Sequence, residues 1–574
     1  MNMSAFELVV QQDLRILVHE QGKRYSEITA ALQRFASLVK NPMGIHTFQI
    51  TPLTLWNAAA YGMQADDIIE LLESYATWPI PLRAKQDITL WMNRYGMFTL
   101  MSSDDERSLS LVAQDPDVLE RMMHDSDTGC LFSGRLQSTI ASVPVKYRGR
   151  LKREFARIGY PVIDKVGYHD GERLTFELGS STIGQEQKIV PFQMRAYQTE
   201  AVQAFIGSES RLGGDGVILL PCGAGKTIIG IGTMAALQSE TLIVTSNVTS
   251  VKQWRQELLE KTTIKADQIG EYTSHHKEIR PVTITTYQMM TYRRSAEEGW
   301  THMRLFHERD WGLIIYDEVH LLPAPIFRTT ADLQATRRLG LTATLVREDG
   351  CERDVFSLIG PKRYEMPWRE LEGEGWIATV QCTEIRVAMS EDTMEHYRRA
   401  SLREKARIAG ENESKIEKTR QLINKHQGVP ILVIGQYLDQ LQQLADVLQA
   451  PLLTGKTSQE ERERQYQQFK NGEVSVLVVS KIANFAVNLP DATVAIQVSG
   501  SYGSRQEEAQ RLGRLLRPKS DGRGAYFYTL VSEGTKEVDY ALKRQLFLIE
   551  QGYRYVLDKE EHEDEHSAAH SKSS

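Results

Sequence analysis

Cysteine is scarce in this sequence, and the few residues present are far apart. Only four occur among 574 residues, Cys130, Cys222, Cys351 and Cys382, and none belongs to a short Cys-x-x-Cys spacing. Disulfide frameworks and zinc or iron–sulfur clusters need cysteines grouped at close, regular spacings. The sequence therefore predicts neither a disulfide-stabilised scaffold nor a cysteine-ligated metal centre.

Long apolar runs are also missing. A membrane-spanning helix needs about 20 consecutive apolar residues, and no stretch of this sequence reaches that length. Residues 1–22 lack the uninterrupted hydrophobic core of a secretory signal. We therefore expect a cytoplasmic protein with no membrane partner.

The sequence also has no excess of basic residues. The 68 lysines and arginines are outnumbered by 75 aspartates and glutamates, which gives a net charge of −7. This balance argues against a protein coated in basic surface. It does not exclude a local nucleic-acid groove, because phosphate contact depends on the charge close to the contact.

The length and composition predict several globular domains. A chain of 574 residues is too long for one hydrophobic core, and 41% hydrophobic with 25% charged residues is typical of globular proteins. Apolar strands alternate with helical stretches in two long regions, the pattern of an α/β fold with parallel sheets covered on both faces. We expect a mostly helical N-terminal domain (1–105), a small α+β domain that is a candidate for DNA or damage contact (106–185), a first parallel-sheet lobe (186–370), a connector (371–424), a second lobe (425–556) and a disordered acidic tail (557–574).

A phosphate-binding loop is the strongest functional signal. It follows the apolar run Val217–Leu220, and ligands bind where such buried parallel strands end. Its glycines let backbone N–H groups surround phosphates, its lysine supplies positive charge, and its threonine hydroxyl can ligate Mg²⁺. The residues predicted to bind ATP here are Cys222, Gly223, Ala224, Gly225, Lys226 and Thr227. Leu220 stands where the usual first glycine would be, although the core Gly-x-Gly-Lys-Thr is intact.

A pair of carboxylates follows a second apolar run, Leu313–Tyr316. Asp317 is expected to hold Mg²⁺ through water, and Glu318 to polarise the water that attacks the terminal phosphate. His320 is expected either to sense the γ-phosphate or to bind across a lobe interface. With the phosphate loop, these residues predict magnesium-dependent hydrolysis of a nucleoside triphosphate.

Two arginines in the second lobe offer a further contribution to that chemistry. Gln510 opens a segment in which Arg514 and Arg517 are three residues apart and share one helix face. Arginines so placed can reach across a cleft and stabilise charge on the transferring phosphoryl group. The alternative is an ordinary amphipathic helix with solvated arginines.

Basic residues gather in one more window, from Lys146 to Arg157, together with Tyr147 and Phe155. Such a cluster can lie on a phosphate backbone. A basic amphipathic helix is also commonly a solvated face. The sequence leaves both interpretations open.

Four motifs together resemble those of superfamily 2 helicases. The phosphate loop, Asp317–His320, Leu341–Thr344 and Gln510–Arg517 are similar to helicase motifs I, II, III and VI. With the phosphate loop, the runs Leu341–Asp349 and Gly503–Arg514 resemble the XPB branch of that superfamily. The resemblance implies two tandem RecA-like lobes with ATP bound between them.

The resemblance also implies roles for residues outside the phosphate site. It implies an adenine-side contact for Arg195 and Gln198, and DNA opening for the triplet Arg347, Glu348 and Asp349. The residues implied to contact a DNA strand, or to couple it to ATP, are Ser246, Asn247, Gln253, Trp254, Thr286, His320, Thr342 and Thr344. Hydroxyls and backbone N–H groups contact phosphates without sequence preference. For Trp254, a core position in a helix is favoured over a base-stacking platform.

Two segments differ from the helicase pattern or lie outside its motifs. Ala483 and Asn488 stand where motif V commonly has glycine and aspartate, which leaves the coupling of hydrolysis to DNA open. Residues 390–420 are charged and helix-prone. They are expected to form either the thumb-like insertion of XPB proteins or a connector.

The sequence thus predicts a DNA-dependent ATPase of XPB type that opens or moves along DNA. The resemblance implies 3′ to 5′ polarity, a role in nucleotide excision repair and a nuclease partner. Three alternatives use the same motifs. They are an RNA remodeller, a duplex translocase that serves a nuclease, and an ATP-controlled clamp or recruitment platform that hydrolyses little ATP.

Overall fold

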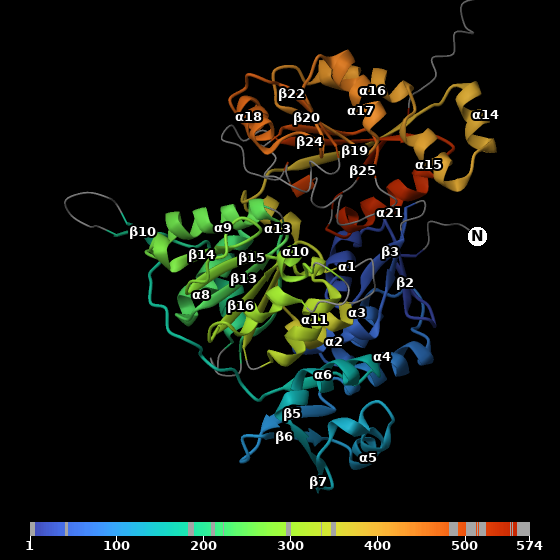
Figure 1. Ribbon diagram of the computed structural model, residues 1–574. Helices are drawn as coiled ribbons and strands as arrows, with labels where there is room; N and C mark the ends of the chain where they lie inside the picture. Colours follow the sequence, from blue (N-terminus) through green and yellow to red (C-terminus); the bar gives the residue numbers. More distant parts are fainter. Residues whose placement is uncertain are drawn as a thin grey trace, which may run out of the picture. The chain divides into compact units, whose positions relative to one another are not determined.

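The computed structural model describes most of the chain, as two compact units. The described residues are 6–40, 44–181, 189–207, 213–221, 223–293, 295, 300–334, 336–345, 352–480, 492–500, 512–513, 515, 524–551, 553 and 555–559. Unit 1 comprises Met1–Leu371 and unit 2 comprises Glu372–Ser574; Figure 1 colours both along the sequence. Within the described residues, no helix combines the length and apolar character needed to cross a membrane.

The first part of unit 1 combines a small sheet with four helices. The sheet is antiparallel in the order β1-β2-β4-β3, with strands β1 (Leu8–Val10), β2 (Arg15–His19), β3 (Ser37–Lys40) and β4 (Ile45–Gln49). The helices are α1 (Tyr25–Leu32), α2 (Pro52–Ala60), α3 (Ala65–Tyr75) and α4 (Leu82–Arg94). Thr51 caps α2 because its hydroxyl accepts a hydrogen bond from Thr54 N at 3.2 Å, and Pro52 occupies the first helical position.

The four strands before residue 50 were not predicted, since the sequence indicated a mostly helical domain here. Each spans only three to five residues, and apolar runs this short carry no distinctive periodicity. Leu8, Val10, Ile16 and Val18 are buried, and the residues between them are less so. The strands therefore contribute one face to the core of this domain.

A five-stranded sheet with two helices follows in unit 1. Its order is β7-β8-β6-β5-β9, and its elements are β5 (Phe98–Ser102), β6 (Ser108–Ala113), α5 (Pro116–His124), β7 (Gly134–Gln137), β8 (Ile140–Pro144), α6 (Arg148–Arg157) and β9 (Val162–Asp164). Leu151 and Phe155 of α6 belong to the core of this α+β domain. Strand β5 lies before the expected boundary at residue 105 but pairs with β6, so the domain begins earlier than the sequence predicted.

The rest of unit 1 is a seven-stranded parallel sheet with its helices, which we call lobe 1. The sheet order is β14-β15-β13-β16-β17-β12-β18. Its strands are β12 (Asp215–Leu219), β13 (Thr241–Thr245), β14 (Ile269–Tyr272), β15 (Val282–Thr286), β16 (Leu313–Asp317), β17 (Arg337–Thr342) and β18 (Lys362–Glu365). Strands β13, β15 and β17 are buried along their whole length, as expected of a parallel sheet covered on both faces.

Most helices of lobe 1 lie between these strands in the sequence, as in other parallel sheets. The helices are α7 (Ala196–Ile206), which precedes β12, α8 (Lys226–Leu237), α9 (Val248–Lys261), α10 (Tyr287–Met290), α11 (Ala324–Asp332), α12 (Glu352–Asp354), the π-helix η6 (Val355–Ile359) and α13 (Trp368–Gly373), which follows β18 and contains the last residue of unit 1, Leu371. A two-stranded antiparallel sheet, β10 (Gly179–Ser181) with β11 (Ile189–Pro191), precedes them. Helices α8 and α9 lie side by side (Figure 1).

Unit 2 is built on a second seven-stranded parallel sheet, which we call lobe 2. Its order is β21-β22-β20-β23-β24-β19-β25, with β19 (Val380–Val387), β20 (Ile431–Gly435), β21 (Leu452–Leu453), β22 (Val476–Ser480), β23 (Val494–Gln497), β24 (Ala525–Ser532) and β25 (Tyr555–Lys559). Helices α17 (Leu438–Leu448), α18 (Gln459–Lys470) and α21 (Glu537–Glu550) belong to it. The two sheets confirm the predicted pair of RecA-like lobes. The predicted bounds of the second lobe, 425–556, are too narrow, because β19 lies in the predicted connector and β25 extends into the predicted disordered tail.

The charged segment from residue 390 to residue 420 is helical and packs onto lobe 2. It contains α14 (Glu391–Arg399), α15 (Leu402–Gly410) and the first part of α16 (Ser414–Lys425). Lys415 is fully buried, and its Nζ donates to Glu537 Oε2 at 2.8 Å and to Val498 O at 3.0 Å. The segment is therefore anchored in lobe 2 and is more than a connector, and its thumb-like role stays a prediction.

Candidate functional site

The phosphate loop follows the carboxyl end of β12 and leads directly into α8. Gly223 (φ 85°) and Gly225 (φ 81°) adopt left-handed conformations, which favour glycine. Helix α8 begins at Lys226, so the N–H groups of its first turn point toward the loop. Leu220 is buried and donates its N–H to Thr342 O at 3.1 Å. This position continues the sheet, which explains why it needs no glycine.

Two residues of α7 hold the loop by its backbone. Tyr197 Oη donates to Ala224 O at 2.7 Å, and Gln198 Nε2 donates to the same carbonyl at 3.3 Å. Gln198 Oε1 accepts from Arg195 N at 3.0 Å, so both ends of this amide are bonded within the lobe. Its contact with adenine stays a prediction. Sequence reasoning missed Tyr197, whose one signal was its place within the Arg-Ala-Tyr-Gln element.

The predicted carboxylates lie at the carboxyl end of β16, on the same edge of the sheet as the loop. Glu318 adopts φ 53°, a conformation that non-glycine residues rarely take and that is enriched at functional sites. Its Oε1 lies 3.6 Å from Lys226 Nζ. Its Oε2 is buried and has no hydrogen-bond partner among the described residues. The structure therefore brings the cation of the loop and one predicted catalytic acid together.

Asp317 is held by two donors and faces a second carboxylate. Thr245 Oγ1 lies 3.2 Å and Trp254 Nε1 lies 2.9 Å from its Oδ2. Burial, followed by the neighbouring Glu318 carboxylate, raises the pKa of Asp317 to about 6. Two adjacent carboxylates at the end of one strand fit a divalent cation, which would compensate their charge. Thr227, in the first turn of α8, adds the hydroxyl that the predicted Mg²⁺ site requires.

His320 connects the acidic segment to strand β17. Its Nδ1 lies 2.6 Å from Thr342 Oγ1 and 3.4 Å from Glu318 Oε2. Thr342 Oγ1 in turn donates to Thr344 O at 2.7 Å. These contacts join Glu318 to the segment predicted as motif III. The two predictions for His320, sensing the γ-phosphate and binding across a lobe interface, stay predictions.

The residues predicted to contact DNA at lobe 1 are largely engaged in helix caps. Asn247 Oδ1 accepts from Ser250 N at 3.0 Å to cap α9, and its amide donates to Ser246 Oγ at 3.0 Å. Thr286 is 5% exposed and caps α10 by accepting a backbone N–H at 3.1 Å. Gln253 is half-buried on α9. Contact of these residues with DNA stays a prediction.

Trp254 is a core residue of α9. It is 1% exposed, so the prediction that it is a platform for DNA bases is wrong, because stacking requires an accessible ring face. The favoured interpretation, a helical core aromatic, is confirmed. Its hydrogen bond to Asp317 was not foreseen, because the two residues are 63 positions apart and no local pattern relates them.

Several predicted site residues lie outside the described part of the chain. They are Cys222, Arg347, Glu348, Asp349, Ala483, Asn488, Gln510, Arg514 and Arg517. The DNA-opening triplet, the atypical motif V and the arginines of motif VI therefore stay predictions.

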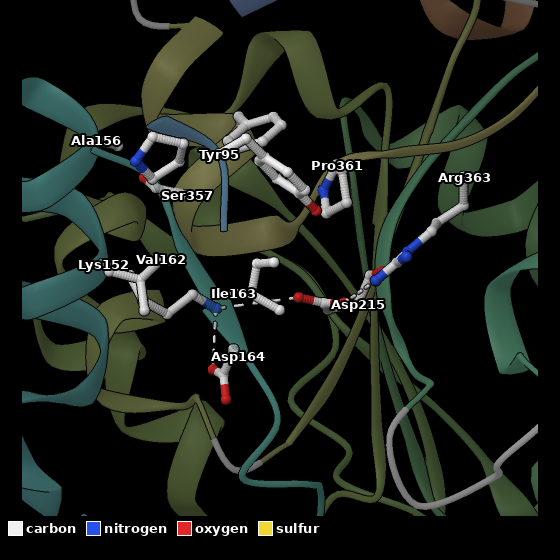
Figure 2. Close-up of a pocket in the computed structure, with 12 residues that line it drawn as sticks. Tyr95, Lys152, Ala156, Val162, Ile163, Asp164, Asp215, Ser357, Pro361 and Arg363 are labelled. Carbon is white, nitrogen blue, oxygen red and sulfur yellow. Dashed lines mark hydrogen bonds and ion pairs between the residues drawn. The ribbon is translucent and has the colours of Figure 1, made fainter. Parts of the chain in front are cut away.

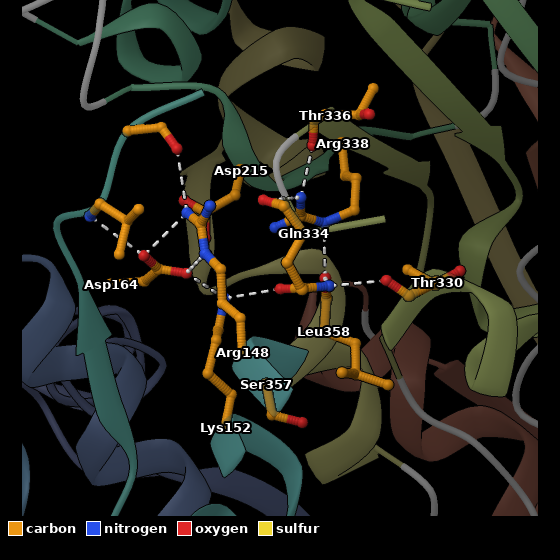
Figure 3. Close-up of polar contacts among 12 residues, drawn as sticks. Arg148, Lys152, Asp164, Asp215, Thr330, Gln334, Thr336, Arg338, Ser357 and Leu358 are labelled. Atoms are coloured by element: carbon orange, nitrogen blue, oxygen red, sulfur yellow. Dashed lines mark hydrogen bonds and ion pairs between the residues drawn. The ribbon is translucent and has the colours of Figure 1, made fainter. Parts of the chain in front are cut away.

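The basic window from residue 146 to residue 157 contains α6, and two of its cations are used inside the protein. Arg148 donates to Asp164 through Nε at 2.9 Å and through Nη2 at 2.8 Å, as Figure 3 shows. Lys152 Nζ lies 3.1 Å from the same carboxylate and 2.9 Å from Gln334 Oε1. Both cations are buried, so for them neither DNA contact nor a solvated face is correct. The exposed Lys146 keeps both interpretations open.

Lys152 also links the α+β domain to lobe 1. Lys152 Nζ lies 3.9 Å from Asp215 Oδ2 in β12, and Asp215 accepts from Arg363 of β18 at 2.8 Å. These side chains line a small cavity of about 100 Å³ (Figure 2). Arg338 of β17 is fully buried and donates to Leu358 O at 2.7 Å. Buried charges thus hold the small domain against the sheet that carries the phosphate loop.

Three family models match the chain. The model described as ERCC3/RAD25/XPB C-terminal helicase matches residues 371–574. The model described as Helicase conserved C-terminal domain matches residues 8–137, and Type III restriction enzyme, res subunit, matches residues 191–347. The last of these ranges contains the phosphate loop and both carboxylates.

Curated proteins are similar to this chain over nearly its whole length. One from Kineococcus radiotolerans, named DNA 3′-5′ helicase XPB, is 48% identical over 96% of this chain and 96% of that protein. One of the same name from Mycobacterium tuberculosis is 46% identical over 96% of this chain and 97% of that protein. One from Encephalitozoon cuniculi, named General transcription and DNA repair factor IIH helicase/translocase subunit XPB, is 34% identical over 95% of this chain and 82% of that protein.

Proposed function

Because the chain belongs to the XPB family of superfamily 2 helicases, we propose that it is an ATP-dependent DNA helicase that opens or moves along DNA in the 3′ to 5′ direction. The names of its relatives support the substrate and the polarity. The structural observation that carries the proposal is the contact of 3.6 Å between Lys226 and Glu318. It joins a phosphate-binding cation to a carboxylate suited to activating water.

ATP is proposed to bind with its phosphates against the start of α8. The N–H groups of the first turn and Lys226 would bind the β- and γ-phosphates. Thr227 and Asp317 would hold Mg²⁺, which neutralises charge on the phosphates and orients the group being transferred. Tyr197 and Gln198 fix the carbonyl of Ala224, so the loop keeps its shape without the nucleotide having to order it.

Glu318 is proposed to orient and polarise the attacking water. Its buried Oε2 has no hydrogen-bond partner among the described residues, and a water molecule would satisfy this acceptor. Lys226 Nζ, 3.6 Å from Oε1, contacts the same carboxylate from the phosphate loop. Arg514 and Arg517 keep their predicted role of stabilising charge on the transferring phosphoryl group.

The biological setting is proposed from the relatives. The Encephalitozoon cuniculi protein carries the words DNA repair factor in its name, and we propose nucleotide excision repair for this chain. A nuclease partner and a cytoplasmic location complete the proposal. Both rest on the resemblance and on the composition of the sequence.

Strand separation on forked DNA tests the proposal. With ATP and Mg²⁺, the protein should unwind a fork whose loading strand is a 3′ overhang and should leave the fork with a 5′ overhang intact. Lys226→Ala should abolish both ATP hydrolysis and unwinding. Unwinding from the 5′ overhang alone would contradict the polarity, and wild-type hydrolysis by the variant would contradict the site.

Nucleic-acid stimulation separates this function from its alternatives. ATP hydrolysis should increase with single-stranded or duplex DNA and remain at the basal rate with RNA. Stimulation by RNA alone would favour a remodeller. Hydrolysis no faster than background at saturating DNA would favour a clamp or recruitment platform.

A further inference from the structure

We propose that Trp254 is a positioning residue that orients the Asp317 carboxylate for its metal and joins it to the helix whose first turn carries predicted DNA contacts. The inference rests on the proposed function, since it takes Asp317 as a magnesium ligand. It assigns no chemistry to the indole itself. Trp254 acts through the carboxylate that it holds.

The hydrogen bonds at Asp317 determine how its carboxylate is oriented. Among the described residues, both side-chain donors to this carboxylate bond to the same oxygen, Oδ2: Trp254 Nε1 at 2.9 Å and Thr245 Oγ1 at 3.2 Å. Two bonds on one oxygen fix the rotation of the carboxylate. Oδ1 is then the oxygen available to a cation or to a water of its shell. Outer partners of this kind set the orientation of metal-binding carboxylates.

The backbone at this point is held as well. Tyr287 Oη, from the start of α10, donates to Asp317 O at 2.8 Å. The strand end, the carboxylate and the helices α9 and α10 are therefore bonded together. A carboxylate held from both its main chain and its side chain loses little conformational freedom when a metal binds.

The indole ring of Trp254 packs between helix α8 and strand β16. A Cβ atom on Gly230, in the middle of α8, would lie 2.5 Å from Trp254 Cη2 and 3.4 Å from Ile315 Cδ1. Glycine is unfavourable inside a helix, and this one leaves the space that the ring fills. The ring is thereby fixed between α8, which begins with the phosphate loop, and β16, which ends with Asp317. Its position is set by both halves of the nucleotide site.

Helix α9, which carries Trp254, begins at predicted DNA contacts. Asn247 caps α9 and, with Ser246, belongs to the predicted DNA-contact segment. Trp254 is two helical turns further on, about 10 Å along the axis. A displacement of α9 as the lobe engages a DNA strand would move the indole N–H relative to Asp317. One rigid helix thus connects the predicted DNA contact to the metal ligand.

Trp254→Phe removes the donor and keeps an aromatic ring. Trp311→Phe is the matched control: Trp311 is 2% exposed, and its indole N–H donates to Leu305 O at 2.9 Å just before β16 begins. Each variant loses one buried indole hydrogen bond in the same lobe. Only the first of them touches Asp317.

The primary measurement is the Kd of Mn²⁺ by electron paramagnetic resonance, in full-length protein with a non-hydrolysable ATP analogue. Loss of an outer partner typically weakens metal affinity roughly 10–100-fold, and we expect about a tenfold increase in Kd for Trp254→Phe and no change for Trp311→Phe. The Mg²⁺ concentration for half-maximal ATP hydrolysis should rise in parallel. Saturating Mg²⁺ should restore most of kcat, which a general loss of packing would not allow.

A second variant keeps the test decisive where Trp254→Phe folds poorly. Gly230→Ala keeps both side-chain donors to Asp317, Trp254 and Thr245, but its Cβ displaces the indole ring. The Kd of Mn²⁺ should therefore also rise. An unchanged Kd in both variants would overturn the inference. Wild-type protein that neither binds Mn²⁺ with the nucleotide nor hydrolyses ATP would instead overturn the proposed function.

Discussion

Lys226 Nζ lies 3.6 Å from Glu318 Oε1, although the two residues follow strands β12 and β16, which are not neighbours in the sheet. Strand β17 separates β12 from β16, and the contact spans it at the carboxyl edge. Lys226 also donates to Leu220 O at 3.5 Å. Phosphate oxygens would therefore have to compete with at least these two partners among the described residues.

Glu318→Gln separates ATP binding from hydrolysis. The amide keeps the shape of the side chain but removes its charge, so the water loses its proton acceptor while Lys226 loses a competing anion. We expect kcat of DNA-stimulated hydrolysis to fall about 10²–10⁴-fold, with ATP bound as tightly as in the wild type or more tightly. Steady-state kinetics and nucleotide titration measure both. A comparable loss of ATP affinity would argue against the proposed role.

Thr342→Val tests the connection between His320 and motif III. The substitution keeps the side-chain volume and removes the hydroxyl that lies 2.6 Å from His320 Nδ1. Basal ATP hydrolysis should change less than about threefold, because no phosphate-binding group is removed, whereas unwinding should fall about tenfold. Thr330→Val is the control, since Thr330 is also fully buried and its hydroxyl lies 2.9 Å from Tyr316 Oη. Equal effects of the two variants on unwinding would refute the connection.

The sheets and the phosphate loop were predictable because local patterns determine them. Val217–Leu220 and Leu313–Tyr316 are apolar runs that end in polar residues, and the rules for parallel sheets place those ends together. Trp254 and Tyr197 were not predictable as partners of the site. Each acts through one hydrogen bond to a residue on another element, and such a bond has no periodicity or spacing in the sequence.

Helix α6 shows that the sequence also does not determine whether a cluster of basic residues is solvated or buried. Its composition indicated a cation-rich face, and two interpretations followed. Neither allowed for Asp164, a single carboxylate 16 residues after Arg148 that holds two cations in the interior. Whether a cluster of like charges is solvated or buried depends on its counter-charges, and these come from β9 and β12.

Asp164→Asn should destabilise unit 1 strongly. The amide leaves the buried Arg148 and Lys152 without their shared carboxylate, and breaking a buried ion pair costs about 3–5 kcal/mol. Differential scanning calorimetry should show a lower Tm for the transition of unit 1. Asp127→Asn is the control, because Asp127 and its partner Arg157 are each 57% exposed and such surface pairs contribute about 0–1 kcal/mol. Equal Tm shifts would contradict the buried network.

The Asp164 carboxylate also makes the protein less stable at acid pH. Burial alone would raise the pKa of Asp164, but the charges of Lys152 and Arg148 lower it below its ordinary value. The unfolded chain then binds more protons than the folded chain at acid pH. The contribution of Asp164 to the free energy of unfolding is therefore complete above about pH 4 and is lost as the pH falls further. Denaturant titrations between pH 7 and pH 3 should show a steeper acid loss for the wild type than for Asp164→Asn. Parallel curves would exclude Asp164 as a source of the acid sensitivity.

Trp56→Ala should detach the N-terminal domain from lobe 1. Trp56 of α2 is fully buried, with its ring centroid 6.0 Å from that of Phe356 and 6.2 Å from that of Trp91. The adjacent Asn57 Oδ1 accepts a hydrogen bond from Lys362 N in β18 at 3.0 Å. The indole therefore packs between its own domain and the π-helix that leads into β18. Removing it should cost about 3–5 kcal/mol.

Limited proteolysis distinguishes detachment of the domain from general unfolding. Detachment should expose cleavage sites between α4 and lobe 1. The basal ATP hydrolysis of lobe 1 should stay within about threefold, because the ring contacts of Trp56 among the described residues are with Trp91, Arg353 and Phe356, outside the nucleotide site. Trp78→Ala is the matched control, since that indole is 55% exposed, and it should leave both the digestion pattern and the Tm unchanged. If Trp56→Ala were digested like the wild type, the N-terminal domain would depend on other contacts for its position. If hydrolysis were lost together with the domain contact, residues 8–94 would be required for the folding of lobe 1 itself, because a docked accessory domain would leave the nucleotide site intact.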